Sequence, residues 1–128
     1  MPRRADDDAR ASRDRGQDFE AIAERYLRKR GLRLILRNYN CRGGELDLIM
    51  QHGPTLAFIE VRFRSSQRFG GAIESVDRKK QARIIVAAKH FLMTHSQFAD
   101  RACRFDVVGI HGEGKAQVVD WITGAFSA

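Results

Sequence analysis

The chain has 128 residues, of which 43% are hydrophobic, and it carries a formal net charge of +7. This length and composition favour one globular domain with its own core, and they argue against a disordered or membrane-spanning chain because no apolar run could cross a bilayer. The positive charge favours a polyanionic partner, nucleic acid before an anionic membrane, although a solvated basic surface would give the same balance.

The N-terminal 15 residues are predicted to be a disordered charged tail, and residues 16–128 to form the single domain. The tail has no apolar segment of the kind found in secretory signals. The two cysteines, Cys41 and Cys103, are not spaced as C-x-x-C and fall in predicted strands, so we expect buried free thiols. Together these features predict a protein of the reducing cytoplasm.

Hydrophobic spacing predicts a helix over residues 16–30 and strands over residues 32–41, 45–51 and 55–64. The helix has an acid at its start and basic residues at its end, which suits the helix dipole, and a glycine follows at the C′ position. The dipeptide Gly53-Pro54 favours a two-residue II′ hairpin turn between the second and third strands.

The later elements are a loop, a helix and two strands, over residues 65–75, 76–94, 103–110 and 116–122. Ser75 is the expected N-cap of the second helix. A helix, a three-strand meander, a second helix and returning strands are typical of an α/β sandwich with a mixed sheet.

Two acids face each other across the predicted hairpin. With a loop of two residues, the register puts Asp47 opposite Glu60 and Glu45 opposite Arg62. Carboxylates directly across a sheet repel, and a divalent cation between them would relieve the repulsion because hard cations take carboxylate oxygens. Asp47 and Glu60 are therefore candidate metal ligands, and the alternative that both are solvated or paired with arginines stays open.

The segments GELDLI at residues 44–49 and FIEVRFR at residues 58–64 resemble the D…E-x-K core of restriction-endonuclease-like nucleases. The resemblance is closer still to the YraN family of bacterial endonuclease-like proteins, which look like archaeal Holliday-junction resolvases. Other matching segments are GxxxExxA at residues 16–23, RNY at 37–39, KQ at 80–81 and RFDV at 104–107. The resemblance implies a restriction-endonuclease-like three-layer core, with a central mixed sheet of four to five strands flanked by helices.

Carried over residue by residue, the resemblance implies that Asp47 and Glu60 bind Mg²⁺ or Mn²⁺, with the Val61 carbonyl as a further ligand. It also implies catalytic roles for Glu20, an acid that the first helix places near the metal, and for Gln81, a polar residue near the start of the second helix.

Arg62 stands where the wider nuclease family has a lysine. Arginine stays protonated and cannot act as a general base, but it can stabilise charge that develops on a phosphate. Arg64, Arg68, Lys79 and Lys80 are expected to hold a nucleic-acid backbone, and a solvated helix start is the alternative for the two lysines.

The implied function is metal-dependent hydrolysis of phosphodiester bonds by an activated water, in branched or otherwise structured DNA. Two alternatives stay open: a non-catalytic nucleic-acid-binding module and an interaction component of a DNA-processing complex. Resolvase-like relatives act as dimers, so the resemblance also raises the expectation of a homodimer.

Overall fold

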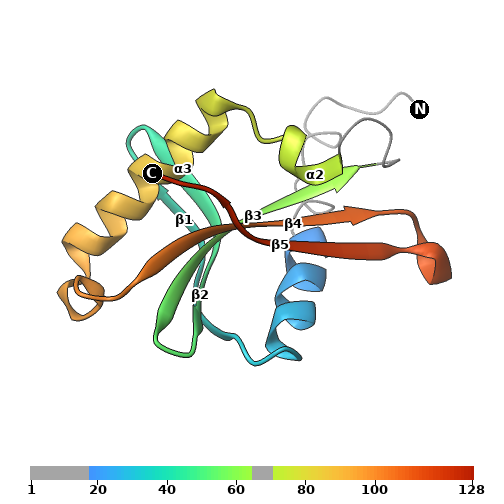
Figure 1. Cartoon of the computed structure of the whole chain (residues 1–128), viewed down its shortest axis with the longest axis horizontal. Helices are drawn as coiled ribbons and strands as arrows, with labels where there is room; N and C mark the ends of the chain where they lie inside the picture. Colours follow the sequence, from blue (N-terminus) through green and yellow to red (C-terminus); the bar gives the residue numbers. More distant parts are fainter. Residues whose placement is uncertain (1–17, 65–70) are drawn as a thin grey trace, which may run out of the picture.

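The structure, a computed structural model, describes residues 18–64 and 71–128 of the chain (Figure 1). Within these residues, five strands form one sheet in the order β1-β2-β3-β4-β5. The strands are β1 (Arg33–Cys41), β2 (Gly44–His52), β3 (Thr55–Arg64), β4 (Cys103–His111) and β5 (Val118–Phe126). Neighbouring strands are antiparallel except β3 and β4, which are parallel, so the predicted mixed sheet is confirmed.

The parallel pair is joined through helix α3 (Arg78–Thr94), because parallel strands need a crossover connection. Helix α3 packs on one face of the sheet, where Ile84 and Phe91 are buried with Phe58 and Phe105. The N-terminal helix, described over residues 18–28, covers the other face (Figure 1). Helix, sheet and helix form three layers, in agreement with a restriction-endonuclease-like core.

The N-terminal helix ends as its sequence predicts. Gly31 has a φ of 95° and its N–H donates to the Arg28 carbonyl over 3.0 Å. A positive φ is accessible to glycine at little cost, so Gly31 is the C′ residue. Residues 16 and 17 of the predicted helix lie outside the described residues, as does the predicted tail over residues 1–15.

The predicted hairpin turn is confirmed, because His52 pairs with Thr55 and Gly53 has a φ of 58°. The predicted cap of α3 is wrong: Asp77, not Ser75, is the N-cap, and its carboxylate accepts the Lys80 N–H over 2.7 Å. Both residue types cap helices well, and the helix begins at the one whose oxygen reaches the N3 amide.

Three further predictions need correction. The predicted loop is in part helical, since α2 (Gly71–Glu74) lies within it, while residues 65–70 lie outside the described residues. Strand β5 continues to Phe126 because that ring stacks on Phe105 in β4. Both cysteines are free, as predicted, but Cys103 is exposed and Cys41 is only half-buried.

Glycine at position 44 allows α3 to lie close to β2. A Cβ atom at Gly44 would lie 2.4 Å from the Arg83 carbonyl oxygen and 2.7 Å from the Ala87 amide nitrogen. Both of these atoms belong to the backbone, so a side chain at position 44 would force the helix away. The first turns of α3 therefore lie directly over the start of β2.

Among the described residues, no helix combines the length and the apolar character needed to cross a membrane.

Candidate active site

The hydrogen-bonded ladder between β2 and β3 stops beside Asp47. Its last pair is Leu48 with Ile59, and the same register continued by one residue puts Asp47 opposite Glu60, as predicted. Beyond that point the Asp47 carboxylate takes the place of a backbone acceptor and receives the Val61 N–H over 2.8 Å. This bond fixes the Asp47 side chain at the point where the two strands separate.

Glu60 is a buried acid with an unsatisfied oxygen. Its residue is 4% exposed, and no described group donates a hydrogen bond to its buried Oε2 atom. Burial, and then the charge of Asp47, raise the pKa of Glu60 to about 8, while the cations Lys80 and Arg62 oppose that shift. Buried polar atoms in native proteins nearly always have a hydrogen-bond partner. The unpaired Oε2 of Glu60 therefore points to a ligand that would bind there.

A third carboxyl group comes from the N-terminal helix. Glu20 is half-buried, and in its protonated form it donates a hydrogen bond to Asp47. Burial first, and then this bond and the charge of Asp47, raise the pKa of Glu20 to about 8. Three carboxyl groups from three elements thus meet at one place, here called the carboxylate cluster: Glu20, Asp47 and Glu60.

The donor set of the carboxylate cluster suits a hard divalent cation. Across the described residues, no three His, Cys, Asp or Glu side chains form a ready-made metal cage. Mg²⁺ does not need one, because it commonly takes one or two carboxylates and fills its other positions with water and substrate oxygens. The orphaned Oε2 of Glu60 and the opposed Asp47 carboxylate fit that pattern. The role of the Val61 carbonyl stays a prediction.

The neighbouring cations are arranged differently from the prediction that pairs Glu45 with Arg62. Glu45 binds Lys80 Nζ over 2.6 Å and Arg83 Nη2 over 3.2 Å, because α3 lies over the start of β2. Arg62 instead places its Nε 3.3 Å from Glu60 Oε1. Bonds from Arg83 and then Lys80 lower the pKa of Glu45 to about 2, so Glu45 is a charged partner of α3.

Lys80 reaches the carboxylate cluster from α3. Its side chain is 22% exposed, and its Nζ lies 3.7 Å from Glu60 Oε1 while it binds Glu45. A lysine held in this way faces the acids rather than open solvent. The structure therefore brings Lys80 together with Glu60, Asp47 and Arg62.

The other predicted residues lie around this centre. Gln81 donates its side-chain amide to the Val76 carbonyl over 3.0 Å, so it holds the segment that leads into α3. Lys79 is exposed on the first turn of α3, and Arg64 is half-buried near the end of β3. Arg68 lies outside the described residues. Contacts of Arg64, Arg68 and Lys79 with nucleic acid, and a place for Gln81 beside a metal, stay predictions.

Sequence reasoning missed an acid one helical turn after Glu20. Glu24 is buried and accepts two hydrogen bonds from Arg37, over 2.6 and 3.0 Å, and Arg28 lies 2.8 Å away. The bond from Arg37 is the main cause that lowers the pKa of Glu24. The i, i+4 spacing of Glu20 and Glu24 places both on one helix face, and that signal was present in the sequence.

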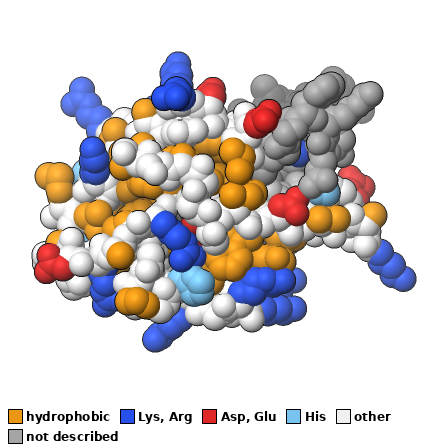
Figure 2. Space-filling model, viewed as in Figure 1, with side chains coloured by type: hydrophobic (Ala, Val, Ile, Leu, Met, Phe, Trp, Pro, Cys, Tyr) orange, Lys and Arg blue, Asp and Glu red, His pale blue; other side chains and the backbone are white. Residues whose placement is uncertain are grey.

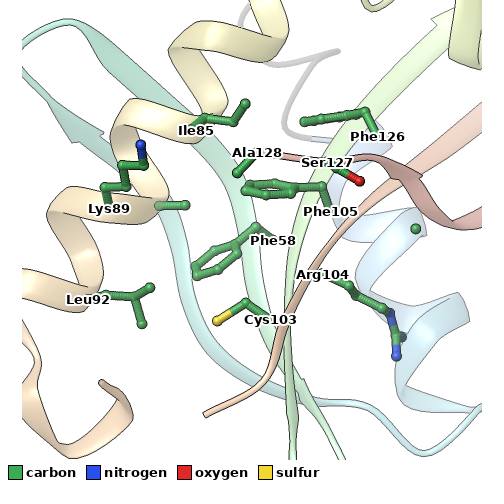
Figure 3. A pocket seen from close by; sticks show the side chains of 12 residues that line it. Phe58, Ile85, Lys89, Leu92, Cys103, Arg104, Phe105, Phe126, Ser127 and Ala128 are labelled. Carbon is green, nitrogen blue, oxygen red and sulfur yellow. The ribbon is translucent and has the colours of Figure 1, made fainter. Parts of the chain in front are cut away.

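An apolar cavity of about 390 Å³ lies elsewhere on the α3 side of the sheet (Figure 3). Aromatic and aliphatic side chains line most of it, and residues 127–128 border it, beside Lys89 and Arg104. None of the described residues that line it is Asp or Glu, so this cavity offers no carboxylate side chain to a metal.

The sequence model of a family described as "Uncharacterised protein family UPF0102" matches residues 19–110. The chain belongs to the UPF0102 family. This confirms the resemblance to the YraN family, which UPF0102 denotes. The matched residues include the whole carboxylate cluster and helix α3.

Individual UPF0102 proteins are similar over most of their length. A protein from Aeromonas hydrophila is 51% identical over 88% of this chain and 84% of its own. One from Nitrosococcus oceani is 51% identical over 89% and 92%, and one from Stutzerimonas stutzeri is 48% identical over 91% and 98%. The similarity therefore extends over most of the chain rather than over one motif.

Proposed function

We propose that this UPF0102 protein is a metal-dependent endonuclease that hydrolyses phosphodiester bonds in branched or otherwise structured DNA. The observation that carries the proposal is the convergence of Glu20, Asp47 and Glu60 at the separation of β2 and β3, with Lys80 and Arg62 beside them. Three carboxyl groups are gathered and partly buried there at a cost to the fold, and a cation between them and a phosphate would stabilise their charged forms.

In this proposal Asp47 and Glu60 would hold Mg²⁺ or Mn²⁺, with the Val61 carbonyl as a further candidate ligand. When bound, the metal lowers the pKa of a water molecule and offsets charge on the scissile phosphate. The Val61 N–H fixes the Asp47 carboxylate beside Glu20 and Glu60, so that side chain is pre-oriented for a ligand.

Glu20 is suited to proton transfer in the proposed reaction. Its raised pKa of about 8 means that its carboxyl group changes protonation near neutral pH. A general base works best when its pKa is close to the operating pH. Glu20 would therefore accept the proton of the attacking water or stabilise a metal, depending on how substrate binding changes its surroundings.

Two cations would offset the charge of the substrate. Arg62 stays protonated at any relevant pH and can only stabilise negative charge. Lys80 supplies an ammonium group from α3, 3.7 Å from Glu60, although position 62 has no lysine. Because Lys80 can supply the positive charge that position 62 would otherwise supply as a lysine, its presence supports an active nuclease rather than a nuclease fold that has lost catalysis.

The preference for DNA rests on the resemblance to resolvase-like proteins and on the net charge of +7. Lys and Arg side chains are spread over the visible face of the molecule rather than gathered in one patch (Figure 2). Binding that depends on phosphate contacts should weaken steeply as salt is added.

The decisive test is cleavage of labelled junction, flap, single-stranded and linear DNA, and of RNA, with Mg²⁺ or Mn²⁺. We expect cuts by the wild-type protein and none by Asp47→Asn, because that change removes a ligand charge while keeping side-chain size. Asp100→Asn is the matched control, since Asp100 is exposed in the turn before β4. All proteins must be purified in parallel to exclude a contaminating nuclease.

Equal cleavage by wild type and Asp47→Asn would contradict the proposed site. Cleavage by Arg62→Lys alone would indicate a nuclease fold with decayed catalysis. Salt-sensitive DNA binding without cleavage by any variant would favour the non-catalytic binding module instead.

A further inference from the structure

We infer that Asn38 is a positioning residue, whose left-handed backbone and side-chain amide hold the Glu20 carboxylate beside Asp47 and thereby set the metal affinity of the carboxylate cluster. The inference rests on the proposed function, since it assigns Asn38 a role in the metal site proposed above. Three independent observations carry it: the backbone of β1, the contact of the amide, and the chemistry of the amide.

The first observation is a break in β1. Asn38 has a φ of 51°, a left-handed conformation that non-glycine residues rarely adopt and that asparagine tolerates best. The register pairs Arg37 with Leu48 and Tyr39 with Leu46, so Asn38 lies opposite Asp47. Strained backbone tends to persist where the surrounding structure requires it, which includes functional sites.

The break changes which way side chains point. In a regular strand, consecutive side chains face opposite sides of the sheet. Arg37 and Asn38 are consecutive, yet both contact the N-terminal helix, Arg37 through Glu24 and Asn38 through Glu20. The partner strand also loses its alternation there, because Leu46 packs with the α3 side and Leu48 with the other side.

The second observation is the contact of the Asn38 amide. With its nitrogen turned toward Glu20, the amide donates to both carboxylate oxygens, over 2.9 and 3.2 Å. An amide nitrogen that contacts both oxygens restricts the rotation of the Glu20 carboxyl group, which is hydrogen-bonded to Asp47. This contact thus links Asn38, in strand β1, to Glu20 of the carboxylate cluster.

The third observation is the chemical difference between the two consecutive contacts. Arg37 neutralises Glu24, which makes that pair a structural link between helix and sheet. Asn38 is uncharged, so it orients Glu20 without cancelling its charge. A neutral donor leaves the Glu20 carboxyl group free to lose its proton and bind a metal ion.

The experiment measures Mn²⁺ affinity by the electron paramagnetic resonance of free Mn²⁺, in the full chain without nucleic acid. Asn38→Gly keeps access to the left-handed backbone and removes only the amide. We expect about tenfold weaker binding, at the lower end of the range for residues that orient metal ligands, because Asn38 is exposed.

Gln97→Gly is the control. It removes a side-chain amide from an exposed residue of the short helix Ser96–Phe98, at the end of α3 opposite to Lys80. We expect this variant to bind Mn²⁺ like the wild type. In a Glu20→Gln background, Asn38→Gly should cause no further loss, because the group it positions is already altered.

Several results would overturn the inference. Wild-type affinity in Asn38→Gly would do so, and so would equal losses in Asn38→Gly and Gln97→Gly, or a full additional loss in the Glu20→Gln background. Absence of Mn²⁺ binding by the wild type would instead overturn the proposed function, and this inference with it. The two failures are therefore distinguishable.

A second measurement does not depend on how Asn38→Gly folds. The side-chain amide resonances of Asn38 in the metal-free protein should move in Glu20→Ala and stay in place in Asp100→Asn. Unmoved resonances in Glu20→Ala would overturn the inference, since the amide would then have no bond to Glu20.

Discussion

Of the described cations beside the carboxylate cluster, Lys80 has the larger effect on the pKa of Glu60. Its ammonium binds Glu45 over 2.6 Å and lies 3.7 Å from the buried Glu60. Glu45 keeps Arg83 as a second partner, whereas Glu60 has only Arg62 besides Lys80 among the described ion pairs. Removal of Lys80 would therefore affect Glu60 more than Glu45.

We expect Lys80→Met to raise the pKa of Glu60 further, because the Lys80 charge now opposes the effects of burial and of Asp47. Metal binding requires the charged carboxylate, so Mn²⁺ binding should need a higher pH in this variant. The measurement is Mn²⁺ affinity across pH for wild type, Lys80→Met and Lys79→Met.

Lys79→Met is the matched control, because Lys79 is exposed one residue earlier on the same helix. If the two variants shift the pH dependence equally, Lys80 acts only through the net charge of the protein. An unshifted Lys80→Met would contradict its contact with Glu60.

At the level of elements, the fit of α3 against β2 brings Lys80 to the acids. That fit depends on Gly44, where a Cβ would lie 2.4 Å from a carbonyl oxygen of the helix. Backbone atoms cannot turn aside as a flexible side chain can, so the helix as a whole must move to make room.

We expect Gly44→Ala to lower the free energy of unfolding by about 1–3 kcal/mol, the usual cost of an added group in a close-packed site. Chemical denaturation checks this as a shift of the midpoint at constant slope. Gly44→Ser should cost more than Gly44→Ala, because it adds another atom in the same place. A Gly44→Ala midpoint equal to that of the wild type would contradict the close packing of α3 on β2.

Sequence reasoning succeeded where the determining contacts are local. The hairpin register follows from Gly53-Pro54, so the opposition of Asp47 and Glu60 could be predicted from the sequence. The start of α3 could not, because Ser75 and Asp77 cap helices equally well by type. Strand β5 was predicted too short because its last residues depend on Phe105, which is remote in sequence.

The same limit applies to the candidate site. The partners of Lys80 depend on how α3 docks, which no spacing in the chain reveals. Asn38 was part of a matching motif, but its role depends on a positive φ inside a strand. Two consecutive polar residues in β1, Arg37 and Asn38, were the available sign that alternation fails there.

At the level of the whole molecule, a basic protein encloses the carboxylate cluster, in which burial raises the pKa of Glu20 and of Glu60. Glu20 and Glu60 titrate near pH 8 in the folded state and near their ordinary values, around 4.5, when unfolded. The folded state therefore binds more protons than the unfolded state between these values, and its stability falls as pH rises.

We expect the melting temperature of the metal-free protein to fall from about pH 5 to about pH 8. Within residues 18–64 and 71–128, the charged groups that act on the two acids are Asp47, Lys80 and Arg62, and of these only Asp47 strengthens the effect. Asp47→Asn should therefore weaken the pH dependence, leaving the part caused by burial.

Added Mg²⁺ should raise the melting temperature most at the alkaline end, because the ion stabilises the charged carboxylates. Thermal unfolding with a chelator and with Mg²⁺ is the measurement. A melting temperature that is constant over this pH range, with or without Mg²⁺, would contradict the buried acid cluster.

The parallel pairing of β3 with β4 also bears on the order in which the chain folds. Strands β1 to β3 meet through short turns, whereas β4 can join β3 only after the whole crossover through α3 has formed. Contacts between residues distant in sequence tend to form late, because the entropy of closing a long loop is lost before the favourable contact energy is gained. We therefore expect Asp47 and Glu60, which lie on one hairpin, to come together before Lys80 reaches them, so that repulsion between the two carboxylates slows the early steps of folding.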